Sequence, residues 1–386
     1  MKVDIKKVCN DVNKSIPFID LKLQQSRIRG RLEKAIKNVL DHGKYIMGPE
    51  VFELEEKLAN FSKAKNVITC SSGTDALLMV LMAKGIGPGD AVFLPSFTYT
   101  ATPEVVALLG ATPIFVDVLN ETYNIDSNNL KESIGIAEKE GLNPKTIIAV
   151  DLFGQPSNYK ALKQVADDNN LWILSDAAQS FGAELNNKKV GKLAYVTATS
   201  FFPAKPLGCY GDGGAIFTDD DELADVLKSI RLHGKGKHKY DNVRVGLNAR
   251  LDTIQAAILL EKIRIFDDEL IVRQNIAGHY NRALQDIVQV PTIINGAKSA
   301  WAQYTIQVNN KELREIIING LKNNGIPSMV YYENPLHLQT AYKHFPTSNS
   351  LEVSEKISKR VLSLPINLEH SSYIVDKFCE IYKNAF

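Results

Sequence analysis

One lysine occupies an unusual place in this sequence. Lys205 lies in SFFPAKPLGCYGDGGAIFT, where aromatic residues precede it, Pro206 follows it and glycines come next. A lysine becomes a nucleophile when a desolvated or cationic surrounding lowers its pKa. A solvated surface lysine is the alternative, but its neighbours weaken that interpretation, because aromatic residues exclude water and glycines let a backbone approach a ligand closely. Lys205 is therefore a candidate for covalent chemistry.

Three other groups could serve the same chemistry. The stretch SSGTDALL begins a helix at Ser71, and the N–H groups of a helix start can cradle an anion. Taken alone, however, it is more typical of an ordinary helix cap. Asp176 ends a buried strand pattern, where a cationic partner or a capping role would be needed to stabilise its carboxylate. Tyr99 offers an aromatic face to a flat ring, although such a tyrosine more often only packs.

The elements that must position these groups alternate along the chain. Helical stretches separate short apolar runs, which are NVITC (66–70), AVFLP (91–95), TPIFVDV (112–118), TIIAVDLF (146–153), LWILSD (171–176), VTATSFF (196–202) and GAIFT (214–218). This alternation indicates an α/β fold with a mainly parallel seven-stranded sheet. The candidate groups follow the carboxyl ends of predicted strands, where open α/β sheets bind ligands. We therefore expect them to converge on one cleft.

The second part of the chain has a different pattern. Residues 1–250 are predicted to form a large cofactor-binding domain with an N-terminal helical arm, and residues 251–386 a smaller α+β domain. A long helical stretch near residues 250–284 is expected to break once. The smaller domain is predicted to contain strands at AQYTIQV (302–308) and IPSMVYY (326–332), and a final helix at 373–386.

Composition excludes several classes of protein. The chain has 386 residues, 45% hydrophobic and 23% charged, with a formal net charge of +1. Such a balance attracts neither nucleic acid nor a membrane surface. The 4 cysteines form no CxxC pair or metal-type spacing, which predicts no metal and fits a reducing cytoplasm. The charged N-terminal segment resembles no signal peptide, so we expect a cytoplasmic protein.

One cofactor would use all four candidate groups. Pyridoxal phosphate has an aldehyde that reacts with a lysine, a phosphate that needs a cradle, a pyridinium nitrogen that pairs with a carboxylate, and a flat ring that an aromatic side chain can cover. The residues therefore favour pyridoxal phosphate chemistry, with Lys205 and Asp176 as its catalytic groups.

At these motifs the chain resembles the DegT/StrS-type sugar aminotransferases. The resemblance runs from IPFIDLKLQQ to VLSLPIN and is carried by GPEVFELEEKLANF, SSGTDALL, PSFTYTATPE, VDLFGQPSN, SDAAQSFGA, SFFPAKPLGCYGDGGAIFT and NARLDTIQAAIL. It implies the type I fold of pyridoxal-phosphate-dependent transferases. It also implies a homodimer with shared active sites, L-glutamate as amino donor and a keto-sugar nucleotide as acceptor.

The resemblance assigns roles residue by residue. Lys205 matches the Schiff-base lysine, and Asp176 matches the acid that keeps the pyridinium nitrogen protonated. The remaining cofactor residues that it implies are Gln179 near the ring, Tyr99 stacked on the ring, Ser72, Gly73, Thr74 and Ser200 at the phosphate, and Asn248 reaching the phosphate from the neighbouring subunit. Related sugar dehydratases carry histidine at the lysine position, so Lys205 points to amino transfer.

The substrate is less closely defined. The sequences around Lys205 and in NARLDTIQAAIL most resemble one branch of the family. That branch acts on UDP-2-acetamido-2-deoxy-3-oxo-glucuronate in the synthesis of bacterial surface polysaccharide, such as O-antigen. Arg250 could bind a carboxylate or form a helix-start salt bridge. Tyr331 and Tyr332 stand where this branch tends to show His-Tyr beside the substrate. His337 could contact sugar or phosphate, though a lone loop histidine is more often solvated.

Several alternatives stay open on sequence grounds. The sequence does not decide between C3 and C4 amination, or between UDP and dTDP sugars. The basic loop 233–240 could guide a nucleotide diphosphate or be solvated. A non-catalytic regulatory or binding protein on the same fold is the alternative of another class, and the presence of Lys205 opposite Asp176 argues against it.

Overall fold

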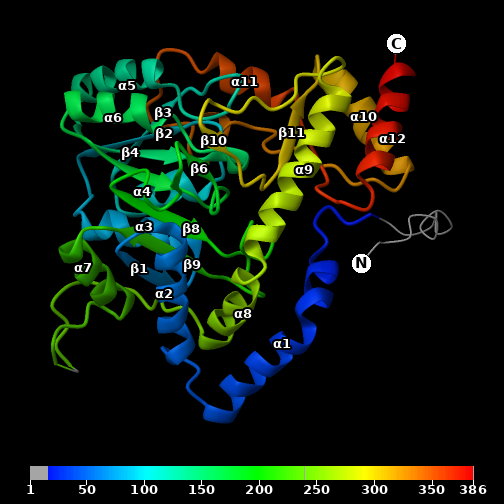
Figure 1. The fold of residues 1–386 in the computed structure, drawn as a ribbon. Helices are drawn as coiled ribbons and strands as arrows, with labels where there is room; N and C mark the ends of the chain where they lie inside the picture. Colours follow the sequence, from blue (N-terminus) through cyan, green and yellow to red (C-terminus); the bar gives the residue numbers. More distant parts are fainter. Residues whose placement is uncertain (1–15, 239, 386) are drawn as a thin grey trace.

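A twisted seven-stranded sheet forms the centre of the molecule (Figure 1), and the computed structural model describes residues 16–238 and 240–385. In spatial order the strands are β1 (Asn66–Cys70), β9 (Gly214–Thr218), β8 (Val196–Ser200), β5 (Trp172–Asp176), β4 (Asn143–Val150), β2 (Asp90–Pro95) and β3 (Thr112–Val116). Only β9 runs antiparallel to its neighbours. The predicted mainly parallel sheet is confirmed.

Helices cover both faces of this sheet (Figure 1). They are α2 (Pro49–Ser62), α3 (Gly73–Ala83), α4 (Ala101–Leu108), α5 (Ser127–Lys139), α6 (Tyr159–Asp168), α7 (Asp221–Arg231) and α8 (Thr253–Ile263). Val92 and Leu94 of β2 pack with residues of α3, α4 and α7, whereas Ala91 and Phe93 pack with residues of α5 and α6. Alternate side chains of one strand thus enter two apolar layers, as expected for a sheet buried on both faces.

The smaller C-terminal region has its own core. It contains α9 (Phe266–Leu284), α10 (Lys311–Asn323), α12 (Ser371–Lys383), and the antiparallel pair β11 (Tyr304–Gln307) and β12 (Val361–Leu364). The long helical stretch breaks between α8 and α9, as predicted. The strand predicted at 326–332 is wrong, because that segment makes only an isolated bridge from Met329 to Ser363. Pro327 lacks the N–H group that a strand ladder requires.

The segment after residue 334 returns to the large sheet. Leu336 N–H donates to Ser96 C=O at 2.9 Å, and Ser348 N–H donates to Phe115 C=O at 2.9 Å. Leu336 and Tyr342 join the apolar cluster over β2 and β8. The short 3₁₀ turn η3 (Leu336–Leu338) and α11 (Glu352–Ser358) belong to this return. The boundary at residue 250 stays a prediction, and part of the chain beyond it lies against the large sheet.

The remaining elements connect these two regions. The arm helix α1 (Leu21–His42) packs against α8, and Figure 1 shows it set apart from the sheet. A small sheet joins β10 (Ala297–Lys298), β6 (Glu184–Leu185) and β7 (Lys188–Lys189), and a 3₁₀ turn, η2 (Leu152–Gly154), follows β4. Among the described residues, no helix is long and apolar enough to cross a lipid bilayer.

Candidate active site

Asp176 ends β5 with its carboxylate almost fully buried, at 6% exposure. Its Oδ2 accepts a hydrogen bond from the Thr102 hydroxyl at 3.0 Å, and its Oδ1 accepts one from Ala178 N–H at 3.2 Å. Burial raises the pKa of Asp176, while these two donors and the charge of Lys205 act in the opposite direction. A cation placed against this carboxylate would therefore stabilise its charged form.

Lys205 lies in a tight turn just beyond β8. Its N–H donates to Phe202 C=O at 2.9 Å. Gly208 closes the turn, because an added Cβ there would lie 2.5 Å from Pro203 O. Burial lowers the pKa of the Lys205 amine, and the negative charge of Asp176 opposes that shift. The lysine and the acid thus interact electrostatically, and the lysine is more easily neutral than a solvated one.

The N-terminus of α3 and the end of β8 meet closely. Ser72 caps α3 by accepting the Asp75 N–H at 3.0 Å. An added Cβ on Gly73 would lie 2.6 Å from Ser200 Cβ. The N–H groups of Gly73 and Thr74 belong to the first helical turn, where no internal acceptor exists. Ser72, Gly73, Thr74 and Ser200 are therefore gathered at one helix start, which suits an anion.

Gln179, Tyr332 and Tyr99 form a cluster of one amide and two aromatic side chains. Gln179 accepts Phe153 N–H through Oε1 at 2.7 Å and donates through Nε2 to the Tyr332 hydroxyl at 3.3 Å. The rings of Tyr332 and Tyr99 are 6.4 Å apart. Burial raises the pKa of Tyr332, so its hydroxyl stays protonated. Tyr99 is 56% exposed in the single chain and has a free face for a ring.

Asn248 and Arg250 lie in the segment that precedes α8. Asn248 forms an isolated bridge with Leu232 and is exposed. Between the two residues, Ala249 C=O accepts the Ser71 N–H at 3.2 Å, which places this segment beside the start of α3. The Nε of Arg250 is buried and has no hydrogen-bond partner within the described chain. The substrate and partner-subunit roles of these residues stay predictions.

His337 is held by the protein at both ring nitrogens. Nδ1 lies 2.5 Å from Ser96 Oγ, and Nε2 lies 3.3 Å from Glu355 Oε1. Its side chain is 9% exposed, so it is not a solvated loop histidine. A contact with substrate would have to replace one of these interactions, and that role stays a prediction.

A cleft of about 330 Å³ opens beside Lys205. Gln24 and Arg27 of α1 line one side, and Glu269 and Arg273 of α9 line another. Gln24 donates to Glu269 at 2.6 Å. Asp176 and Tyr99 do not line it, so this cleft approaches the lysine from the side of the arm helix.

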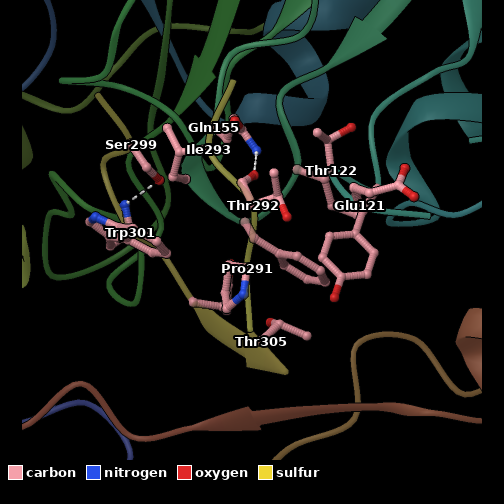
Figure 2. Close-up of a pocket in the computed structure, with 13 residues that line it drawn as sticks. Glu121, Thr122, Gln155, Pro291, Thr292, Ile293, Ser299, Trp301 and Thr305 are labelled. Atoms are coloured by element: carbon pink, nitrogen blue, oxygen red, sulfur yellow. Dashed lines mark hydrogen bonds between the residues drawn. The ribbon is translucent and has the colours of Figure 1, made fainter. Parts of the chain in front are cut away.

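A second, much smaller cavity is lined by Phe153 and Gln155, which follow β4. Figure 2 shows it between residues 121–123 and the segment 291–305, where Gln155 donates to Thr292 C=O at 2.9 Å. Its volume is about 20 Å³, enough for one water molecule. None of the predicted site residues lines it.

The basic loop projects from the large domain beyond α7. Lys235, Lys237 and His238 line a surface hollow together with Asp225 and Asp241. Lys239 lies outside the described residues. Arg244 lines the same hollow, so the two carboxylates only partly offset its basic side chains.

Comparisons of this chain with known proteins identify its family. The family model described as the DegT/DnrJ/EryC1/StrS aminotransferase family matches residues 26–382. The chain belongs to this family. Aminotransferases of this family depend on pyridoxal phosphate, which confirms the expected enzyme class, cofactor and type I fold.

Individual relatives agree with this membership. A Pseudomonas aeruginosa protein named UDP-2-acetamido-2-deoxy-3-oxo-D-glucuronate aminotransferase is 47% identical over 91% of this chain and 95% of its own length. A Geobacillus stearothermophilus protein named pleiotropic regulatory protein is 38% identical over 96% of this chain and 99% of its own length. The crystal structure of a DegT/DnrJ/EryC1/StrS aminotransferase from Brucella abortus is 52% identical, with a TM-score of 0.92 over 96% of this chain and 99% of that one.

The residues present fit the cofactor that the family uses. The helix start at Gly73 leaves no room for a side chain, and the buried carboxylate of Asp176 forms no ion pair with any residue that the structure describes. Sequence reasoning missed Thr102, although it lies within the quoted PSFTYTATPE motif. A threonine three residues after Tyr99 was the available signal, but only the folded chain brings it to Asp176.

Proposed function

We propose that this enzyme transfers the amino group of L-glutamate to a keto-sugar nucleotide, with UDP-2-acetamido-2-deoxy-3-oxo-glucuronate as the first candidate. The observation that carries the proposal is that Lys205 lies near enough to the buried carboxylate of Asp176 for their charges to influence each other, in a fold whose helix start at Gly73 suits an anion. The relative named for this substrate, at 47% identity, supports the choice of sugar.

Pyridoxal phosphate, when bound, supplies an aldehyde and a ring that withdraws electrons. Lys205 would hold the aldehyde, because its partly desolvated amine is more often neutral and nucleophilic. The same amine, when free, would move a proton at the substrate carbon. One lysine thus serves as nucleophile and as proton carrier.

Asp176 would keep the ring nitrogen protonated. Its carboxylate is buried and accepts hydrogen bonds from Thr102 and Ala178, so its orientation is fixed. A protonated ring nitrogen next to a buried carboxylate forms a charge-assisted hydrogen bond. Gln179 and Tyr332 would border the ring, and Tyr99 would cover its face.

Substrate binding would rely on cations near the lysine. Both L-glutamate and a uronate carry carboxylates, which an arginine binds in bidentate fashion. Arg250 is suited to this role, because its buried Nε has no partner within the described chain. Arg27 and Arg273 also line the cleft beside Lys205, but Glu269 lies 3.5 Å from Arg27 and offsets part of their charge.

We further propose a cytoplasmic homodimer that acts in the synthesis of bacterial surface polysaccharide. The family resemblance supports a dimer, and Asn248 is exposed in the single chain, so it is free to contact the partner subunit's cofactor. A regulatory protein on the same fold is the second candidate, because the relative at 38% identity is named pleiotropic regulatory protein. Lys205 argues against it, because binding alone does not need this lysine.

The test is a visible absorption spectrum of the purified protein with added pyridoxal phosphate, before and after L-glutamate. We expect a visible band that bleaches with glutamate and is absent in Lys205→Ala. Candidate 3-oxo and 4-oxo UDP and dTDP sugars are then compared for restoring the band. A wild-type protein that forms no band would reject catalysis and favour the regulatory candidate.

A further inference from the structure

A fully buried carboxylate lies next to the active site without a role in the chemistry above. Asp151 is the first residue after β4 and has 0% exposure. Its Oδ1 accepts hydrogen bonds from Ser157 N–H and from the Tyr159 hydroxyl, both at 2.8 Å. Its Oδ2 accepts one from the Ser180 hydroxyl at 2.8 Å. A carboxylate buried this deeply requires such donors.

The Asp151 side chain reaches the turn that carries two predicted cofactor residues. The pairing of β4 with β5 ends at Val150 and Asp176. Beyond that point, Asp151 N–H donates to Asp176 C=O at 3.1 Å, and the Asp151 carboxylate holds Ser180. Residue 151 is therefore bonded to both ends of the turn from Asp176 to Ser180.

The same turn contains Gln179. Its side chain is bonded to Phe153, two residues after Asp151, and to the Tyr332 hydroxyl. Because Ser180 is the next residue, its bond to Asp151 restrains the backbone that carries Gln179. Backbone bonds hold the first part of this turn, because Ala177 N–H donates to Ala198 C=O at 2.8 Å and Ser180 N–H donates to Ala177 C=O at 3.1 Å. Neither bond involves the side chain of Gln179 or of Ser180.

We propose that Asp151 is a positioning residue, whose carboxylate holds the Asp176–Ser180 turn so that Asp176 and Gln179 face the cofactor. The proposal rests on the proposed binding of pyridoxal phosphate by Asp176 and Gln179. Asp151 touches neither cofactor nor substrate, and acts through Ser180 and the backbone of Asp176.

The geometry requires a carboxylate at this position. Donors approach both oxygens, so an asparagine would turn an amide NH₂ toward at least one of them. Burial raises the pKa of Asp151 to about 7, with the hydrogen bonds from Ser157, Tyr159 and Ser180 opposing that shift, so the charged form that accepts all these donors prevails only above neutral pH. Removing the Ser180 hydroxyl breaks only the link to the turn and leaves the bonds at Oδ1 in place.

Two variants and one control test the proposal. Asp151→Asn and Ser180→Ala each disturb the link, whereas Ile147→Val alters a core residue of β4 and leaves the network in place. The measurements are the dissociation constant of pyridoxal phosphate, the pH dependence of its visible absorption when bound, and the melting temperature of each apoprotein.

We expect both variants to bind pyridoxal phosphate about tenfold more weakly, the effect of losing one hydrogen bond to a charged group. Their bound cofactor should also titrate at a different pH, because Asp176 is displaced. Ile147→Val should keep wild-type values for both, even if its melting temperature falls as far.

Two results would overturn the proposal. One is wild-type cofactor affinity and titration in Ser180→Ala and in Asp151→Asn. The other is an equal loss of cofactor affinity in Ile147→Val, which would mean that general destabilisation explains the effect. Should Asp151→Asn fail to fold, Ser180→Ala alone decides. If the wild type binds no pyridoxal phosphate, the proposed function itself fails, and the two failures are thereby distinguished.

Discussion

Gly73 is the residue at which the candidate phosphate site leaves least room. An added Cβ would lie 2.6 Å from Ser200 Cβ, which belongs to a strand end and not to a flexible side chain. We expect Gly73→Ala to destabilise the protein by about 1–3 kcal/mol and to weaken pyridoxal phosphate binding. Urea unfolding and a cofactor titration measure both effects.

Gly135 provides a matched control for that change. It lies inside α5, and an added Cβ there would meet nothing within 4 Å. Gly135→Ala should stabilise the protein by about 0.5–1 kcal/mol and leave cofactor binding unchanged. Wild-type cofactor affinity in Gly73→Ala would contradict the assignment of this helix start to the phosphate.

The pH dependence of cofactor capture follows from Lys205. Burial lowers the pKa of its amine below the ordinary 10.5, and Asp176 raises it. The neutral amine is the reactive form, so the rate of pyridoxal phosphate uptake should rise with pH and level off below pH 10.5. Stopped-flow absorption between pH 6 and 10 measures the midpoint.

The sign of the Asp176 effect gives a further check. Asp176→Asn removes a negative charge that favours the protonated lysine, so the midpoint of uptake should move to lower pH. A midpoint that stays near 10.5 in the wild type would show that Lys205 is effectively solvated.

Residue types alone made part of the site predictable. Lys205 could be singled out because its aromatic and glycine neighbours weaken a surface role. Asp176 could be singled out because it ends a predicted buried strand, where either a cationic partner or a capping role is needed to stabilise it. Thr102 and Ser180 could not, because their roles arise from hydrogen bonds to Asp176 and Asp151 that only the folded chain brings within reach. Hydroxyl residues are common, and nothing local distinguishes a bonded one.

At the level of elements, Asp117 joins the return segment to the large sheet. It follows β3, and its carboxylate accepts the N–H groups of Val353 and Ser354 at 2.9 and 2.8 Å and the Ser354 hydroxyl at 2.6 Å. These are the free donors of the first turn of α11. One carboxylate thus caps a helix more than 230 residues away.

We expect Asp117→Ala to destabilise the protein by about 2–4 kcal/mol, since buried donors lose a charged acceptor. Asp126→Ala is the control, because Asp126 caps α5 at an exposed position and should cost about 1 kcal/mol. Equilibrium urea unfolding compares them. Equal losses would mean that the Asp117 contact adds nothing beyond ordinary capping.

His337 and Tyr342 show why the elements of the second half were harder to predict. His337 lies against Ser96, and the Tyr342 hydroxyl lies 2.6 Å from Thr100 Oγ1, so both hold the loop that carries Tyr99. Their sequence, PLHLQTAY, has no regular period, and its structure is set by contacts with the large sheet. Apolar periodicity located the sheet strands well. The strand predicted at IPSMVYY was wrong, because Pro327 cannot donate to a strand ladder even though the neighbouring residues have a β-branched and aromatic composition.

At the scale of the whole molecule, the proposed dimer with shared sites can be tested by mixing subunits. Lys205→Ala and Asn248→Ala chains are each expected to be inactive alone. If Asn248 serves the partner subunit's site, each mixed dimer contains one intact site. Random exchange should then restore about a quarter of the wild-type sites, measured as turnover after co-refolding.

The control pairs Lys205→Ala chains with chains that carry both changes, a mixture without any intact site. No recovery in the first mixture would place the action of Asn248 within its own subunit. Sequence could suggest this sharing only through family resemblance, because composition and periodicity carry no information about a second chain.

The contact between Ser96 and His337 joins residues 241 positions apart, and this spacing has a consequence for synthesis. At about 5–20 residues per second, Ser96 would leave the ribosome roughly 12–50 s before its partner does. Until then the edge of β3, which pairs with Thr347 in the finished protein, is open to other strands. A chain interrupted before residue 337 would therefore contain every strand of the sheet but not the contacts that hold the loop around Tyr99, and we expect chaperones and proteases to bind such a chain before it can act as an enzyme.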